Sequence, residues 1–177
     1  ADPDHYDRYH THCDVLIAGA GPGGLAAALA AGRSGARVII ADERHELGGS
    51  LLARAVQLDG APAQSWVGDV LAELSSLENV RLLPRTTVFG YYSHNFLGLL
   101  ERRYSHLPPG TGVSARERVW RVRAKRVVIA TGAIERPLVF CNNDRPGVMT
   151  ASAVSTYINR YAVAPGRRAV VFTNNDS

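Results

Sequence analysis

The sequence predicts an α/β fold in which helices cover the faces of a parallel sheet and a small antiparallel β-meander is inserted. Two observations predict it. An apolar strand, residues 13–18, runs into Gly19-x-Gly21-x-x-Gly24 and then into an alanine-rich stretch. A second apolar run, residues 37–41, ends in Asp42. Strand, glycine-rich turn, helix, strand and acid in this order are typical of Rossmann-like FAD/NAD(P)-binding folds.

The glycine-rich turn predicts a site for the pyrophosphate of a dinucleotide. Gly19 permits a sharp turn, Gly21 lets the backbone approach the phosphates, and Gly24 lets the helix pack closely on the strand. Pro22 suits the first turn of a helix, whose free N–H groups face an anion. The same glycine spacing also occurs in ordinary loops, so the interpretation depends on Asp42. Asp42 is either a ligand of the ribose or an exposed acid that caps the strand end.

The remaining elements follow from hydrophobic periodicity. We expect helices over 22–34, 66–77 and 152–161. Strands are expected at 37–41, 80–83, 86–92, 96–100, 116–125, 126–130 and 169–172, with turns at 61–64 and 93–95. The strand at 126–130 is expected to be fully buried and to end in Thr131-Gly132, at the edge where open α/β sheets bind ligands.

The strand at 116–125 alternates in character. Three apolar side chains face one side, and three cations, Arg121, Arg123 and Lys125, face the other. We interpret the basic side as a solvated face. The alternative is a docking surface for a partner subunit or for phosphates.

Composition restricts the class of protein. The 177 residues are 46% hydrophobic and 20% charged, with a net charge of +4, as in a globular protein. This charge is too modest and dispersed to predict nucleic-acid binding. No apolar run is long enough for a membrane span, so we expect a cytoplasmic protein. Cys13 and Cys141 lack the spacing of a metal site and are expected to be free thiols.

The domain organisation indicates a piece of a larger polypeptide. The only methionine is Met149, and the sequence stops just after an apolar run. We expect a polar lead-in over 1–12 and a dinucleotide-binding domain over 13–140. Residues 141–177 are expected to form a connector helix and the first strand of a truncated second domain.

Four further segments carry a resemblance to a known family. They are LLPRTTVFGYY (82–92), ATGAIERP (130–137), NNDRPGV (142–148) and NRYAVAPG (159–166). Together with the glycine turn they resemble the alpha subunit of heterotetrameric sarcosine oxidase, which has a glutathione-reductase-like nucleotide-binding domain. In that family the alpha subunit carries NAD, FAD lies in the beta subunit, and FMN lies between them. The whole complex oxidises sarcosine to glycine, formaldehyde and peroxide.

The resemblance implies partners and roles for this chain. The partners are a beta-like flavin subunit, the other subunits of a hetero-oligomer and the remainder of the alpha chain, without nucleic acid or membrane. Gly23 would offer its N–H, Asp42 would bind the adenosine ribose, and Val88 would meet the adenine. The expected cofactor site comprises Gly19, Gly21, Pro22, Gly23, Gly24, Asp42, Glu43, Arg44, Gly49, Ser50, Val88, Thr131 and Gly132.

Two functions remain open at this point. In the first, the chain is a segment that binds NAD as a structural ligand and is inactive by itself. In the second, it is the redox-active FAD-binding domain of a flavin- and nicotinamide-dependent oxidoreductase. The glycine turn accepts either dinucleotide, and no residue has the pattern of a catalytic group or of a metal ligand. A pure interaction module rests on the basic strand alone.

Overall fold

The computed structural model describes residues 4–58, 60–109 and 115–174. A six-stranded sheet with the strand order β5-β2-β1-β8-β7-β6 forms its centre. The strands are β1 (Tyr6–Ala18), β2 (Val38–Ala41), β5 (Val80–Leu83), β6 (Thr86–Tyr92), β7 (Phe96–Arg102) and β8 (Glu117–Ile129). β5, β2, β1 and β8 are parallel, and β7 and β6 continue the sheet as an antiparallel meander. The predicted α/β fold class is therefore confirmed.

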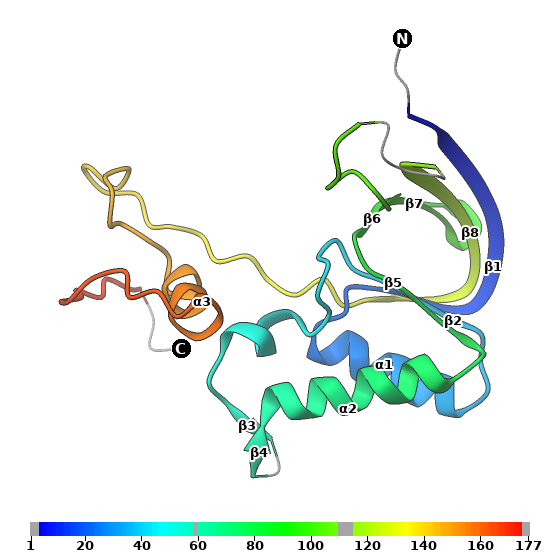
Figure 1. Ribbon diagram of the computed structural model, residues 1–177, viewed down its shortest axis with the longest axis horizontal. Helices are drawn as coiled ribbons and strands as arrows, with labels where there is room; N and C mark the ends of the chain where they lie inside the picture. The colour runs from blue at the N-terminus through cyan, green and yellow to red at the C-terminus, as the bar shows by residue number, and fades with distance from the viewer. Residues whose placement is uncertain (1–3, 59, 110–114, 175–177) are drawn as a thin grey trace.

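Two helices cover one face of the sheet. α1 (Pro22–Arg33) and α2 (Ala63–Ser76) run side by side beneath β1, β2 and β5 (Figure 1). They are joined through β2, the 3-10 turn η1 (Gly49–Ala53) and a short hairpin of β3 (Gln57–Leu58) and β4 (Ala61–Pro62). Fully buried Ile17, Leu25 and Leu74 join sheet and helices in one core. No helix in the described ranges is long and apolar enough to cross a membrane.

A second core lies inside the curl of the sheet, where β1, β8, β7 and β6 bend away from the helices (Figure 1). The apolar side of β8 contributes Trp120 and Val122, and β7 contributes Leu97 and Leu99. The indole Nε1 of Trp120 donates to a carboxylate oxygen of Glu101 at 2.7 Å, which satisfies its polar edge. The alternation predicted for 116–125 thus places one side in a core.

The structure corrects the prediction for the N-terminal segment. Residues 1–12 were expected to be a polar lead-in, but β1 already begins at Tyr6. Its first half pairs with β8 from Tyr6↔Glu117 onward. Two contacts hold this pairing: Arg118 forks onto the carboxylate of Asp7 at 2.8 and 2.7 Å, and the rings of Tyr9 and Trp120 pack edge to face at 4.8 Å. Partner residues therefore stabilise a strand that lacks an apolar pattern.

The two strands predicted at 116–125 and 126–130 are one strand, β8. Its last part is not fully buried, because Ile129 is 60% exposed. The pairing of β7 with β8 ends at Phe96↔Arg123. Beyond Arg123, β8 has a strand partner on one side only in the described part of the chain, and its side chains are correspondingly less covered.

The C-terminal part contains a confirmed helix and a strand prediction that is wrong. α3 (Ala151–Tyr161) packs on η1, where the hydroxyl of Ser155 donates to the carbonyl of Ala53 at 2.6 Å. Residues 169–172 form no strand, and Val170 is 97% exposed. An extended segment needs a neighbouring strand to accept its hydrogen bonds, and no described strand lies beside this one. The turn predicted at 61–64 is also replaced, because α2 begins at Ala63.

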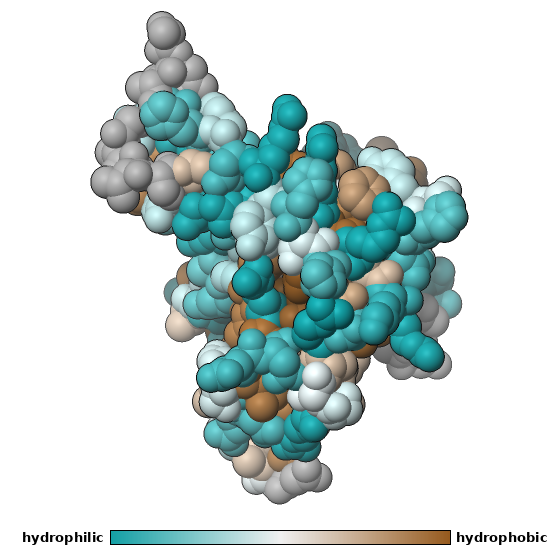
Figure 2. Space-filling model, turned by 90° about the vertical axis from the view of Figure 1, so that its right-hand side faces the viewer, coloured by the Kyte–Doolittle hydropathy of each residue, from teal (hydrophilic) through white to brown (hydrophobic). Residues whose placement is uncertain are grey.

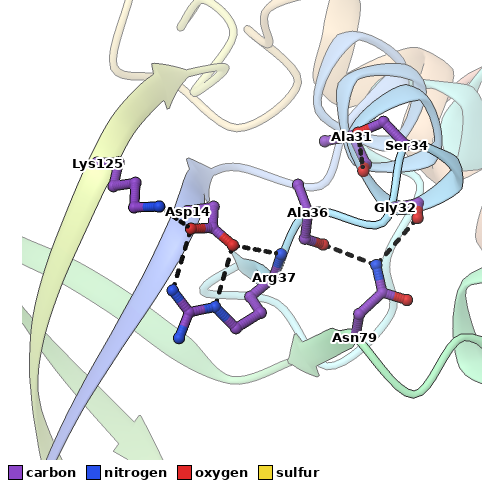
Figure 3. Close-up of polar contacts among 8 residues, drawn as sticks. All are labelled: Asp14, Ala31, Gly32, Ser34, Ala36, Arg37, Asn79 and Lys125. Atoms are coloured by element: carbon purple, nitrogen blue, oxygen red, sulfur yellow. Dashed lines mark hydrogen bonds and ion pairs between the residues drawn. The ribbon is translucent and has the colours of Figure 1, made fainter.

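A polar cluster ties the amino ends of the parallel strands together (Figure 3). The carboxylate of Asp14 accepts from the guanidinium of Arg37 at 3.0 Å and pairs with Lys125 at 2.9 Å. These contacts, led by the hydrogen bond from Arg37, hold the pKa of Asp14 well below its usual value. The neighbouring Cys13 is a buried free thiol and Cys141 an exposed one, as predicted. Burial raises the pKa of Cys13 to about 11.

Candidate functional site

The glycine-rich turn stands where β1 ends, wedged between β2 and β8. The N–H of Gly19 donates to the carbonyl of Ala41 on the β2 side at 2.8 Å. Gly19 has a φ of +102°, and a Cβ on it would lie 2.3 Å from the carbonyl oxygen of Ala130. Because a side chain is excluded by both backbone angle and space, only glycine fits at this crossing of three strands.

The first turn of α1 presents bare backbone to the space above the sheet. A Cβ on Gly24 would lie 1.9 Å from the carbonyl oxygen of Gly19, so the helix rests directly on the turn. Gly23 is exposed, and a Cβ there would meet nothing within 4 Å. Pro22 occupies the start of the helix, and Gly21 provides no side-chain cap. The N–H groups of this first turn are thus available to an anion, which the helix dipole also favours.

A second glycine pair closes on the first. The N–H of Gly48 donates to the carbonyl of Ala20 at 2.8 Å. A Cβ on Gly49 would lie 2.7 Å from the Cα of Gly21. The start of η1 therefore packs backbone to backbone against the glycine turn, and it leaves Ser50 exposed beside the start of α1.

Asp42 has a structural role that the sequence did not reveal. One carboxylate oxygen accepts from the N–H of Ala20 at 2.7 Å, and the other accepts from the N–H of Arg44 at 2.9 Å. The carboxylate thus fixes the glycine turn to the end of β2. Each carboxylate oxygen has two lone pairs, so each keeps one acceptor position for a ribose hydroxyl.

The other predicted residues lie around the same edge of the sheet. The N–H of Thr86 donates to the carbonyl of Asp42 at 2.7 Å, which sets the half-buried Val88 two residues further along β6. The N–H of Ala130 donates to the carbonyl of Ala18 at 2.8 Å, so exposed Thr131 and Gly132 follow directly beside the turn. Exposed Glu43 and Arg44 continue from Asp42. The structure therefore brings the predicted site residues to the carboxyl ends of the parallel strands, where open α/β sheets bind ligands.

A basic cavity next to Asp42 was missed by the sequence prediction, apart from Arg44. It has a volume of about 570 Å³, and its lining includes Arg44, Arg85, Arg102 and Arg160. The guanidinium of Arg102 donates to the carbonyl of Glu43 at 3.2 Å. These arginines come from the start of β6, the end of β7 and α3, so nothing in the linear sequence groups them. Their charge favours phosphate or carboxylate groups in the cavity.

The N-terminus of α3 differs from that of α1, because a side chain of the same chain occupies it. The carboxylate of Glu135 accepts from the N–H groups of Ala151 at 3.1 Å and Ser152 at 2.7 Å. Hydrogen bonds from the side chain and backbone of Ser152 hold the pKa of Glu135 below its usual value. Of these two helix starts, the bare one is therefore at the glycine turn.

The sequence matches known oxidoreductases. A family model described as FAD dependent oxidoreductase matches residues 14–94. The chain is 55% identical to the sarcosine oxidase alpha subunit of Corynebacterium sp. (strain P-1), over 99% of this chain and 18% of that subunit. It is 52% identical to the Rhizobium meliloti (strain 1021) alpha subunit, over 100% and 18%. It is 33% identical to an opine oxidase subunit of Agrobacterium tumefaciens (strain Ach5), over 89% and 31%. The chain thus spans less than a third of the length of each of these relatives.

Solved structures share the fold. L-proline dehydrogenase from P. horikoshii superposes with a TM-score of 0.71 and 29% identity, over 90% of this chain and 31% of that one. Thioredoxin reductase from Lactococcus lactis superposes with a TM-score of 0.53 and 21% identity, over 75% and 39%. The second likeness concerns the fold alone. Both are similar to this chain in the arrangement of the parallel sheet and its helices.

Proposed function

Because the chain is homologous to a segment of the sarcosine oxidase alpha subunit, which is part of an oxidoreductase, we propose that it is the dinucleotide-binding segment of an oxidase subunit. Its ligand in this proposal is NAD, held as a bound nucleotide and not as the reacting centre. The whole complex would oxidise sarcosine or a related secondary amine on another subunit. This proposal extends from a chain that covers 18% of the alpha subunits to the activity of the whole.

The observation that carries the proposal is the bare first turn of α1 beside Asp42. The N–H groups of Gly23 and Gly24 would bind the pyrophosphate, and the free lone pairs of Asp42 would accept from the ribose hydroxyls. Val88 and Arg44 would flank the adenine. The cradle fits such a ligand, because a Cβ on Gly24 or Gly49 would close the turn that receives it.

Binding, and not proton transfer, is the chemistry that this chain supports. The cavity beside the turn is lined by several arginines. A guanidinium stays protonated in proteins, so it holds anions but cannot act as a general base. NAD, when bound, supplies a ring that exchanges hydride, and the protein provides the orientation and electrostatics around it.

The second candidate is an FAD-binding domain, and the description of the matching family favours it. The test is to release the nucleotide by acid from the full-length polypeptide and identify it by mass spectrometry and absorbance. We expect NAD, without a flavin band near roughly 450 nm. Release of FAD from this polypeptide alone would replace the first proposal with the second.

An activity assay separates the two candidates further. The 177-residue chain should release no peroxide from sarcosine, with or without added FAD and FMN. Reconstitution with the remaining alpha sequence and a beta-like subunit should restore peroxide release. A sample without sarcosine is the control. Sarcosine-dependent peroxide from this chain and FAD alone would contradict the binding-segment proposal.

A further inference from the structure

The outer face of the curled sheet carries cations and aromatic rings that the dinucleotide site does not use. This face lies opposite the side that buries Trp120 and Val122. We call it the arginine–aromatic face and define it by Arg8, His10, His12, Phe89, Tyr92, Phe96, Arg121 and Arg123. Figure 2 views the molecule from the β1 and β8 side, and there hydrophilic side chains project with hydrophobic residues between them.

The strand register places the cations next to one another. His10 lies opposite Arg121, and His12 lies opposite Arg123, so these side chains share one face of the sheet. Neither Arg8 nor Arg121 has an ion pair within the described ranges, whereas Lys125 on the same strand is paired with Asp14 at 2.9 Å. Cations on neighbouring strands repel one another across the sheet, and this repulsion disfavours the folded sheet unless anions neutralise it.

The aromatic rings are seated on glycines. A Cβ on Gly98 would lie 2.6 Å from the ring of Phe89, and one on Gly90 would lie 2.5 Å from the ring of Tyr92. Phe89 is nevertheless 56% exposed and Tyr92 54% exposed. The rings of Tyr92 and Phe96 are 5.9 Å apart, and the guanidinium of Arg123 lies 5.5 Å from the Phe96 ring centroid. Such a combination of Phe, Tyr and Arg is characteristic of the centres of protein interfaces.

The adjoining turn, η2 (Ser93–Asn95), is held in place by side-chain hydrogen bonds. The amide of Asn95 donates to the carbonyl of Lys125 at 3.0 Å, and the hydroxyl of Tyr91 donates to the side-chain oxygen of Asn95 at 2.8 Å. The guanidinium of Arg123 donates to the carbonyl of His94 at 3.3 Å. Because the face is ordered without a ligand, binding there would cost less conformational entropy.

We propose that the arginine–aromatic face docks an acidic surface of a partner protein subunit. Carboxylates of the partner would neutralise Arg8, Arg121 and Arg123, and the rings of Phe89 and Tyr92 would form the water-excluding centre of the contact. A single-stranded nucleic acid also combines stacking with cations, but it is bound in a groove, whereas this face lies on the outside of the curl. The similar proteins are themselves named as subunits, which places partner polypeptides beside them.

The test uses the full-length polypeptide that contains this chain, purified with the subunits that accompany it. The double variant Arg121→Ser/Arg123→Ser removes two cations from the face, and Arg54→Ser/Arg167→Ser, at exposed positions elsewhere, is the control of equal charge. Gly98→Ala displaces the Phe89 ring without a change of charge, and Gly68→Ala, where a Cβ meets nothing within 4 Å, is its control. Mass photometry gives the stoichiometry and the dissociation constant of each assembly.

We expect the double-arginine variant to weaken assembly by about tenfold or more at low salt, and less at about 0.5 M NaCl, where charges are screened. Gly98→Ala should weaken assembly at both salt concentrations, and both controls should assemble normally. Dinucleotide binding should be the same in all variants, so failure here is distinct from failure of the proposed function. Normal assembly of the double-arginine variant would overturn the proposal. So would an equal loss in its control, a self-association of this chain through the face, or tight binding of a single-stranded oligonucleotide there.

Discussion

Replacing Gly24 by alanine should destabilise the chain, whereas the same change at Gly23 should not. A Cβ on Gly24 would lie 1.9 Å from the carbonyl oxygen of Gly19. A carbon–oxygen contact needs about 3.3 Å, so α1 would have to move by about 1.4 Å against its own sheet. Overpacking of this kind costs about 1–3 kcal/mol, and the obstacle is backbone that cannot rotate away. A Cβ on Gly23 meets nothing within 4 Å.

The two variants form a matched pair, because both gain the higher helix propensity of alanine in the same turn. We expect the free energy of unfolding to differ between them by about 2–3 kcal/mol, with Gly24→Ala the less stable. Urea denaturation at equilibrium measures this difference, and thermal unfolding should show it as a gap of roughly 4–12 °C. Equal stability of the two variants would refute the close packing of α1 on the glycine turn.

Four further outcomes test the site and the electrostatics. Gly21→Val should abolish NAD binding in calorimetry, because its side chain would fill the space between the turn and η1; unchanged affinity would remove the turn from the site. The native site should prefer NAD to NADP, since a 2′-phosphate replaces a hydrogen bond worth about 1.5–3 kcal/mol with repulsion from Asp42. Asp42→Asn should narrow that preference, and equal native affinities would assign the choice to the arginines of the cavity. The folded-state pKa of Asp14 is lowered from 3.8, so its stabilisation is present above that value and is lost as the pH falls below it. Asp14→Asn should accordingly flatten the acid dependence of the urea midpoint, and an unchanged slope would contradict this. A thiol reagent should label Cys141 in the native protein and reach Cys13, whose pKa is raised to about 11, only after denaturation.

The parallel half of the fold was predictable because its signals are local. The strand before Gly19, the helix after it and the acid at the end of β2 lie within thirty residues of sequence. The polar strand at residues 6–12 was not predictable, because it depends on the contact of Asp7 with Arg118, far along the chain. Apolar character alone misled at 169–172, where no described neighbour completes the hydrogen bonds of a strand.

The candidate site divides in the same way. Its glycines and Asp42 follow one another along the chain in a recognisable spacing, so their common location was expected. The arginines of the cavity were not, because Arg85, Arg102 and Arg160 meet only through the curl of the meander and the docking of α3. The second role of Asp42 was hidden for another reason: its hydrogen bonds go to backbone N–H groups, which leave no mark in a sequence.

The position of β1 has a consequence for synthesis of the chain. β1 is an interior strand, yet its first half bonds to β8 alone among the described strands. Asp7 and Arg118 are 111 residues apart, so at about 5–20 residues per second the ribosome needs on the order of 5–20 s to deliver the partner. Throughout that interval the nascent strand has open edges that other chains could pair with. Arg8, His10 and His12 discourage such pairing, because charged side chains on a strand oppose edge-to-edge aggregation. The polar character that hides this strand in the sequence therefore protects it until β8 emerges.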